Sequence, residues 1–354
     1  MNKFTAIKSI VFGVLVWIIS STSCKKDTLE TTTAKADTNV VRELLTQIQP
    51  EQQTFIIDAS QPNTLTGKDG MVIEIPANAF INNKDSLVSG NVTIILQEIL
   101  SVGGQITSGI PATSNKKILK SAGEFLFRAV AGGEQLNIAP NRSIIFNIPA
   151  TDVDSTMNTF IANDYFLGIT GEDFNWFQAD SVLFTAKHVD TVAWDSIKKE
   201  WNFDTTYANA HDLQYKSGKY KMTISDLYTH SMFNVDRFIN WGSTTWAQSV
   251  SCVINAPESS NGEPIDFTLK LVFKQFGATS WFDHKGLLGT TATIIVDDEW
   301  PVGEDVVVLV VGVGQKSKKT YFGKTTLNIT ADSKPVIDIS PLSTDELSTA
   351  LGNL

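Results

Sequence analysis

Short runs that alternate apolar and polar residues constrain the fold of this chain more than any other feature. "MVIEIP" at 71–76, "NVTIILQE" at 91–98 and "SIIFNIP" at 143–149 are such runs, and turn-forming clusters such as "GKDG" at 67–70 separate them. Successive side chains of a β-strand point to opposite faces, so each run has one face for a core. The pattern predicts antiparallel strands in a sandwich or barrel. The residues expected to face the core are Met71, Ile73, Ile75, Val92, Ile94, Leu96, Phe125, Phe127, Ile144, Phe146 and Ile148.

The last third of the chain shows the same pattern. "IDFTLKLVFK" at 265–274 predicts a strand with one apolar and one polar face, and "EDVVVLVVGVG" at 304–314 is continuously apolar. A continuous run of β-branched residues is typical of a central strand that is buried on both faces. The first run is expected to bury Phe267, Leu269, Leu271 and Phe273, and to expose Asp266, Thr268, Lys270 and Lys274.

Two short helices are expected, one near each end of the folded region. In "NVVRELLTQIQP" at 39–50, apolar residues recur at helical spacing until Pro50. We expect this helix to dock on the first β-module. Ser343 and Glu346 form a capping-box pattern, which predicts the start of a C-terminal helix.

These patterns together predict a mainly β protein with two or more antiparallel β-sandwich modules. The ranges that we expect are a leader at 1–23, a flexible tether at 24–39, a helix and first β-module at 40–150, an irregular middle region at 151–244, and a C-terminal sandwich with its helix at 245–354.

The leader has the parts of a secretory signal. Lys3 and Lys8 precede an apolar run at 10–19, which is shorter than the about 20 residues that cross a bilayer as a helix. Small residues at 20–23 follow, and then Cys24. This order resembles a bacterial lipoprotein signal, although Ser21 stands where leucine is common. The resemblance implies cleavage before Cys24, acylation of Cys24, and attachment to a membrane, in the outer membrane at the surface or the periplasmic face.

The alternative is an ordinary secretory signal, with Cys24 in a disulfide to Cys252, since the chain has two cysteines. If Cys24 carries lipid, Cys252 has no partner and is expected to be a small buried residue in a strand. A catalytic thiol would require a nearby base and an exposed polar pocket.

Residues 24–39 contain no aromatic side chain and have little to bury, which is typical of a solvated tether. The lysines and aspartate after Cys24 are similar to the surface-export signal of Bacteroidota lipoproteins.

The stretch "LTGKDGMVIEIPANAF" followed by "VSGNVTIILQEIL" resembles the ZU5-like modules of Bacteroidota envelope proteins. The resemblance covers roughly 90 residues. It implies a β-module of the interaction type and implies no catalytic residues. The "FNVDRF" element at 233–238 also resembles a phrase of these lipoproteins.

The formal net charge is −10, and it becomes −12 if the leader with its two lysines is removed. An acidic protein is a poor partner for nucleic acid, which is bound by basic faces. The sequence also lacks G-x-S-x-G, H-E-x-x-H, P-loop and G-x-G-x-x-G patterns, so it nominates no catalytic residue and no cofactor.

The middle region carries the aromatic candidates for ligand binding: Trp176, Trp194 and Trp201 lie among acids and amides. Exposed tryptophans stack on sugar rings and anchor interfaces, and the equally weighted alternative is that they fill a core.

Clustered carboxylates are typical ligands of a calcium ion, although no complete calcium-loop motif is present. The candidate ligands are Asp152, Asp154, Asp297 and Asp298, and the alternative is that these acids lie in solvated turns.

The function expected from these observations is non-enzymatic binding or interaction in the cell envelope, with a glycan or an envelope protein as partner. The first alternative is a glycan-processing hydrolase whose two carboxylates meet only in the fold. The second is a structural subunit of an outer-membrane or secretion complex, which a large exposed apolar patch would favour.

Overall fold

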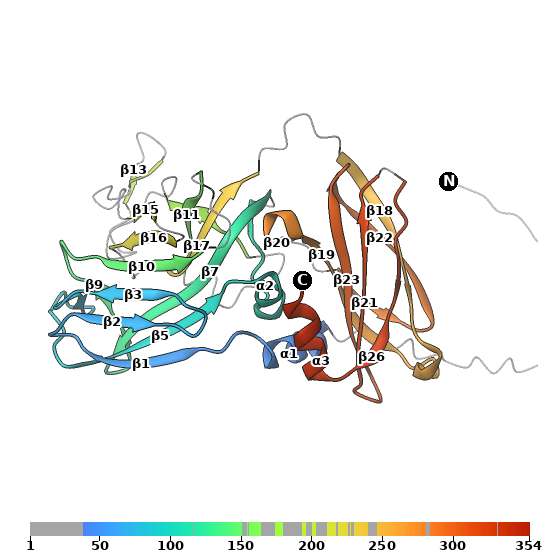
Figure 1. The fold of residues 1–354 in the computed structure, drawn as a ribbon, viewed down its shortest axis with the longest axis horizontal. Helices are drawn as coiled ribbons and strands as arrows, with labels where there is room; N and C mark the ends of the chain where they lie inside the picture. The colour runs from blue at the N-terminus through green and yellow to red at the C-terminus, as the bar shows by residue number, and fades with distance from the viewer. Residues whose placement is uncertain are drawn as a thin grey trace, which may run out of the picture. The chain divides into compact units, whose positions relative to one another are not determined.

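The computed structural model describes residues 38–115, 117–150, 154, 156–163, 174–179, 193–195, 200–202, 211–216, 219–225, 227, 230–239, 246–280, 284–330 and 332–354. These residues all belong to one compact unit, Lys35–Leu354. They form two β-sandwiches and three α-helices (Figure 1). The mainly β, antiparallel architecture with a short helix near each end is confirmed.

The first sandwich has two sheets that face each other. One sheet has the order β1 (Gln53–Asp58), β5 (Asn91–Ile99), β7 (Lys117–Ala131), β17 (His230–Phe238), β11 (Asn158–Asn163) and β12 (Phe177–Gln178), with β6 (Thr113–Ser114) and β8 (Glu134–Gln135) also paired to β7. The other has the order β15 (His211–Lys216), β16 (Lys219–Ile224), β10 (Ile144–Pro149), β3 (Val72–Ile75) and β2 (Asn63–Thr66). Two small pairs accompany them, β4 (Phe80–Ile81) with β9 (Asn137–Ile138) and β13 (Ala193–Asp195) with β14 (Glu200–Asn202).

The core of the first sandwich contains every residue that the alternation in this region placed inside. All of them are buried in one cluster between the two sheets. The ring of Phe146 packs against three other rings, with its centroid 4.9 Å from those of Phe125 and Phe127 and 6.1 Å from that of Phe233. The alternation therefore predicted the inward faces correctly.

Strands of the 151–244 region complete the sheets of the first sandwich. β16 pairs with β10, and β17 pairs with β7 in a register that places Phe233 opposite Phe125. The first sandwich therefore extends beyond residue 150, as far as Phe238.

The second sandwich follows in the chain. Its larger sheet has the order β20 (Ala278–Thr279), β19 (Ile265–Phe273), β23 (Asp305–Gly314), β24 (Thr320–Asn328) and β26 (Ser340–Leu342), with β21 (His284–Leu288) also paired to β19. Its smaller sheet has the order β22 (Thr291–Pro301), β18 (Trp246–Asn255) and β25 (Val336–Asp338). The 3-10 helices η6 (Glu258–Ser260) and η7 (Lys274–Phe276) flank β19.

β23 is the central strand that the apolar run predicted. It lies between β19 and β24, and all its residues after Asp305 are buried. Val306, Val308 and Val310 face the smaller sheet, whereas Val307 and Leu309 face a layer of helices. Both faces are therefore covered.

The helical layer consists of α1 (Thr38–Gln47), α2 (Val102–Ser108) and α3 (Thr344–Gly352). Figure 1 shows α1 in blue beside α3 in red, and leucines of both helices share one apolar cluster with β23. The expectation that α1 docks on the first β-module is wrong, because its apolar face packs on the second sandwich. α3 begins with the predicted capping box at Ser343 and Glu346.

The polar face of β19 is also not as expected. Asp266, Thr268 and Lys270 are 3 %, 3 % and 5 % exposed, so they are buried rather than solvated. They point to the side of the sheet opposite Phe267 and Leu269, the side where α1 packs against β19. Alternation in the sequence predicts which side chains share a face, but it does not predict whether a helix covers that face.

Candidate binding cleft

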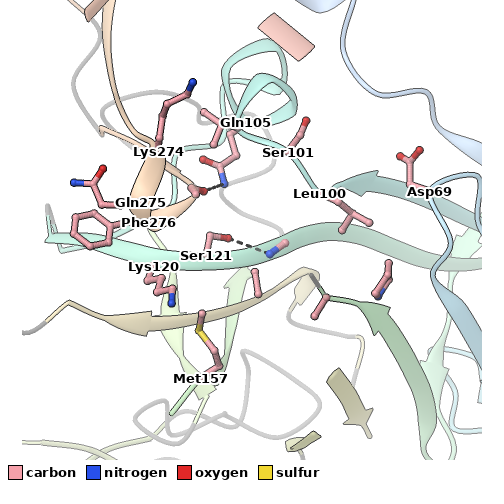
Figure 2. Close-up of a pocket in the computed structure, with 16 residues that line it drawn as sticks. Asp69, Leu100, Ser101, Gln105, Lys120, Ser121, Met157, Lys274, Gln275 and Phe276 are labelled. Atoms are coloured by element: carbon pink, nitrogen blue, oxygen red, sulfur yellow. Dashed lines mark hydrogen bonds between the residues drawn. The ribbon is translucent and has the colours of Figure 1, made fainter. Parts of the chain in front are cut away.

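A cleft of about 610 Å³ lies where the first sandwich, α2 and the second sandwich meet. We call it the seam cleft. Its walls come from β7 at Lys120–Gly123, from α2 at Gln105, from η7 at Lys274–Phe276, and from the turn that carries Asp69 (Figure 2). Residues far apart in the sequence therefore form one concave surface.

α2 is held in place at both ends by its caps. Ser101 accepts a hydrogen bond from the Gly104 amide at the start, and Gly109 ends the helix with φ of 68°. Gly103 lies so close to α3 that an added Cβ would stand 2.4 Å from the Leu351 carbonyl oxygen. The glycines that make this segment a poor helix former are thus needed for its packing.

Gln105 joins α2 to the second sandwich. Its side-chain Nε2 donates to the Gly277 carbonyl at 3.0 Å, and its Oε1 accepts from the Thr279 amide at 3.1 Å. The side chain is 2 % exposed. This amide satisfies one buried donor and one buried acceptor of the neighbouring backbone, so its loss would leave both unpaired.

Gly277 brings the second sandwich against β7. It has φ of 59°, and an added Cβ would stand 2.8 Å from the Ser121 carbonyl oxygen. Ser121 in turn accepts a hydrogen bond from the Gly123 amide, drawn in Figure 2. Both the backbone conformation and the close approach therefore require glycine at this position.

A charged cluster lies at the side of the cleft that Lys120 lines. The Asp154 carboxylate accepts from Arg237 Nε and lies 3.5 Å from Lys120 Nζ. Bonds from the Thr156 hydroxyl and amide, and then from Arg237, hold the pKa of Asp154 well below its usual range. Tyr220 of the facing sheet bonds to the Asp154 backbone at 2.8 Å, so Asp154 ties its turn to both sheets.

Asp69 lies in the turn that the buried Glu98 organises. The Glu98 carboxylate accepts from the amides of Asp69 and Met71, both at 3.0 Å, and from Gln53 Nε2 at 2.8 Å. Desolvation, and then the nearby Glu98, raise the pKa of Asp69.

Trp176 fills a core in this structure. It is 0 % exposed, its Nε1 donates to the Pro111 carbonyl at 3.1 Å, and its ring packs edge-on against Phe174. These contacts fit the core alternative and leave no ring face for a ligand. Trp194 and Trp201 lie opposite each other in the β13–β14 pair, and their side chains are outside the described residues. Ligand binding by these two tryptophans stays a prediction.

The calcium candidates are not brought together among the described side chains. Asp154 is already bound by two cationic side chains, which compete with a metal ion for its oxygens. Asp152 lies outside the described residues, and Asp297 and Asp298 belong to β22 with side chains outside them. Within the described ranges, no group of three metal-binding side chains occurs.

Cys24 and its surroundings lie outside the described residues, so lipidation stays a prediction. Cys252 is buried in β18, as expected for a small apolar residue, and burial raises the pKa of its thiol to about 12. In the part of the chain that the structure describes, no helix is long and apolar enough to span a bilayer.

Sequence reasoning missed the residues that line the seam cleft. The glycine-rich "VGGQ" at 102–105 has the composition of a turn, but it forms the start of α2, which carries Gln105. Lys274 was placed correctly as exposed, but nothing in the pattern linked it to the cleft. One usable signal was Gly277, because an isolated glycine beside a strand often marks a close backbone approach.

Comparison of the chain with protein-family models, with curated proteins and with solved structures finds no match.

Proposed function

We propose that this protein is a lipid-anchored protein of the cell envelope that binds a glycan in the seam cleft. The observation that carries the binding role is the cleft itself, an open space of about 610 Å³ with walls from both sandwiches. Ligand sites occur preferentially in concavities where modules meet. Its lining combines the charged side chains of Asp69 and Lys274 with the apolar ring of Phe276, a mixture that suits a saccharide ring.

The proposed localisation in the cell envelope rests on the leader and on Cys24. A lipid anchor on Cys24 attaches the tether to the outer membrane, at its surface or periplasmic face. The resemblance of the first β-module to ZU5-like envelope modules supports an interaction role for the first sandwich. Substituting Cys24 by Ala abolishes incorporation of labelled palmitate and releases the protein from membranes; unchanged membrane attachment would reject the anchor.

Among the described lining residues, Asp69 supplies the one carboxylate. A glycoside hydrolase of the ordinary kind requires two carboxyl groups about 5–10 Å apart. The lining therefore favours binding over the hydrolase alternative.

Thermal unfolding of residues 25–354 with a panel of polysaccharides tests the binding role. A ligand at 100 times its Kd adds about 2.7 kcal/mol to the unfolding free energy, which shifts the midpoint measurably. The shift is expected with a glycan, with or without EDTA. A shift that EDTA removes indicates a calcium-dependent site instead, and no shift with any glycan moves the proposal to a protein partner.

A further inference from the structure

Most polar side chains that line the seam cleft already bond to the protein. Gln105 bonds to the backbone of the second sandwich, Ser101 caps α2, and Gln275 donates to Glu304 at 2.9 Å. A ligand that displaced one of these bonds would leave a partner unsatisfied and gain little. These groups shape the cleft more than they recognise a ligand.

Two charged side chains of the lining are not used in this way. Lys274 is exposed, and among the described residues its ammonium group makes no hydrogen bond and no ion pair. The Asp69 carboxylate accepts no hydrogen bond from any residue in the described ranges. Figure 2 shows Lys274 and Asp69 on opposite sides of the cleft.

Two of the three charged side chains in the described lining are lysines, although the protein as a whole is acidic. The described lining carries Lys120 and Lys274 against Asp69, whereas the chain has a net charge of −10. Asp154 pairs with the Lys120 ammonium group at 3.5 Å, so Lys274 is the lining lysine whose ammonium group has no partner among the described residues. A positive group in a concave site of an acidic protein favours an anionic ligand over a cationic one.

We propose that the ligand of the seam cleft is an acidic saccharide. Its carboxylate or sulfate group pairs with Lys274, and its hydroxyl groups donate hydrogen bonds to the Asp69 carboxylate. The ring of Phe276, half-buried in the same wall, offers an apolar surface to the C–H face of the sugar. This inference rests on the proposed function, because it names the class of glycan that the cleft takes.

The test compares polymers whose carboxylates are either free or methyl-esterified. Polygalacturonate, alginate and hyaluronate are titrated into residues 25–354 by calorimetry, each beside its methyl-esterified form. The acidic forms bind at least about tenfold more tightly than the esters, and added salt weakens them. The variant K274Q weakens the acidic polymer about three- to tenfold and leaves the ester unchanged, whereas D69N weakens both.

The matched control is K334Q, at an exposed lysine of the second sandwich that is not part of the lining. It binds like the unmodified protein. Equal affinity for the acid and the ester, or equal affinities of K274Q and K334Q, would overturn the proposal that the ligand is acidic. The proposed function would then be the binding of a neutral glycan. Absence of binding to any acidic or neutral glycan rejects the proposed function itself.

Discussion

The two sandwiches have different cores. Between the sheets of the first, three phenylalanine rings pack around Phe146. In the second, the central strand β23 presents valines to both of its faces. A few aromatic rings fill a large volume and make specific contacts with one another. Branched aliphatic side chains are smaller, so many of them share the packing between layers. The first core therefore depends strongly on single residues, and the second distributes its packing over many.

The two regions also differ in how their strands pair. In the first sandwich β10 pairs with β16 and β7 with β17, so residues 70 to 119 positions apart are neighbours. The second sandwich includes the hairpin of β23 with β24, which follows it directly in the chain, beside the long-range pair of β18 with β25. Long-range pairing costs more loop-closure entropy before it is stabilised. We therefore expect the first sandwich to form later during folding than the β23–β24 hairpin.

The largest effect is expected from truncation in the two cores. Phe146→Ala removes a fully buried ring and should lower the unfolding free energy by about 3–5 kcal/mol, whereas Val308→Ala on β23 should cost about 2 kcal/mol or less. Denaturant unfolding measures both, and hydrogen exchange by mass spectrometry locates the loss of protection. Equal costs for the two variants would remove the contrast between a ring-centred and a distributed core.

The link between the sandwiches should be the next most sensitive feature. Gln105→Ala leaves the Gly277 carbonyl and the Thr279 amide without their partner, so it should cost about 1–3 kcal/mol. Exchange at Thr279 and along α2 should rise in this variant. Gln47→Ala, at an exposed position of α1, is the control and should change stability by less than about 0.5 kcal/mol. Matching stabilities for the two variants would show that the amide does not hold the joint.

Alternation along the chain was sufficient to predict the strands and their inward faces. The runs at 71–76 and 143–149, the central strand at 304–314 and the capping box at Ser343 all follow from local rules. Local rules express side-chain direction and backbone capping, and both of these are settled within a few residues.

Partners between elements were not predictable in the same way. α1 is amphipathic, but amphipathicity does not specify which sheet the apolar face packs against, and in the structure that face packs on the second sandwich. The alternating pattern of its strand predicts that Lys270 is exposed to solvent. It is buried because α1 packs on that side of the sheet. The seam cleft shares this origin, because its walls come from segments that only tertiary packing brings together.

We expect the Asp154 cluster to make the stability of the first sandwich depend on pH. A folded-state pKa below the usual range means that the carboxylate stabilises the fold above pH about 4, its unfolded pKa, and that this contribution is lost as pH falls toward the folded pKa. Asp154→Asn should therefore cost about 1–2 kcal/mol at neutral pH and progressively less below pH 4. Denaturant unfolding between pH 2 and pH 7 measures this cost. Thr156→Val removes the hydroxyl that bonds to Asp154, so it should also lower the unfolding free energy at neutral pH, and less so below pH 4. A cost for Asp154→Asn that does not change with pH would show that the charge is unimportant.

The smallest effect is expected at the cap of α3, in the helical layer on the outer side of the second sandwich. The Ser343 hydroxyl oxygen accepts a hydrogen bond from the Glu346 amide at 3.2 Å, and the Glu346 carboxylate accepts one from the Ser343 amide at 2.7 Å. Ser343→Ala should cost about 1 kcal/mol, because two amides at the start of the helix lose their acceptors or their geometry. Ser348→Ala, in the exposed middle of the same helix, is the control and should be neutral or slightly stabilising, since alanine is the better helix former. Hydrogen exchange should place the loss in α3 and in the strand beneath it, where Leu347 is buried against the β23 sheet. If protection falls in the first sandwich as well, α3 transmits its stability through α2, and the two sandwiches unfold as one cooperative unit.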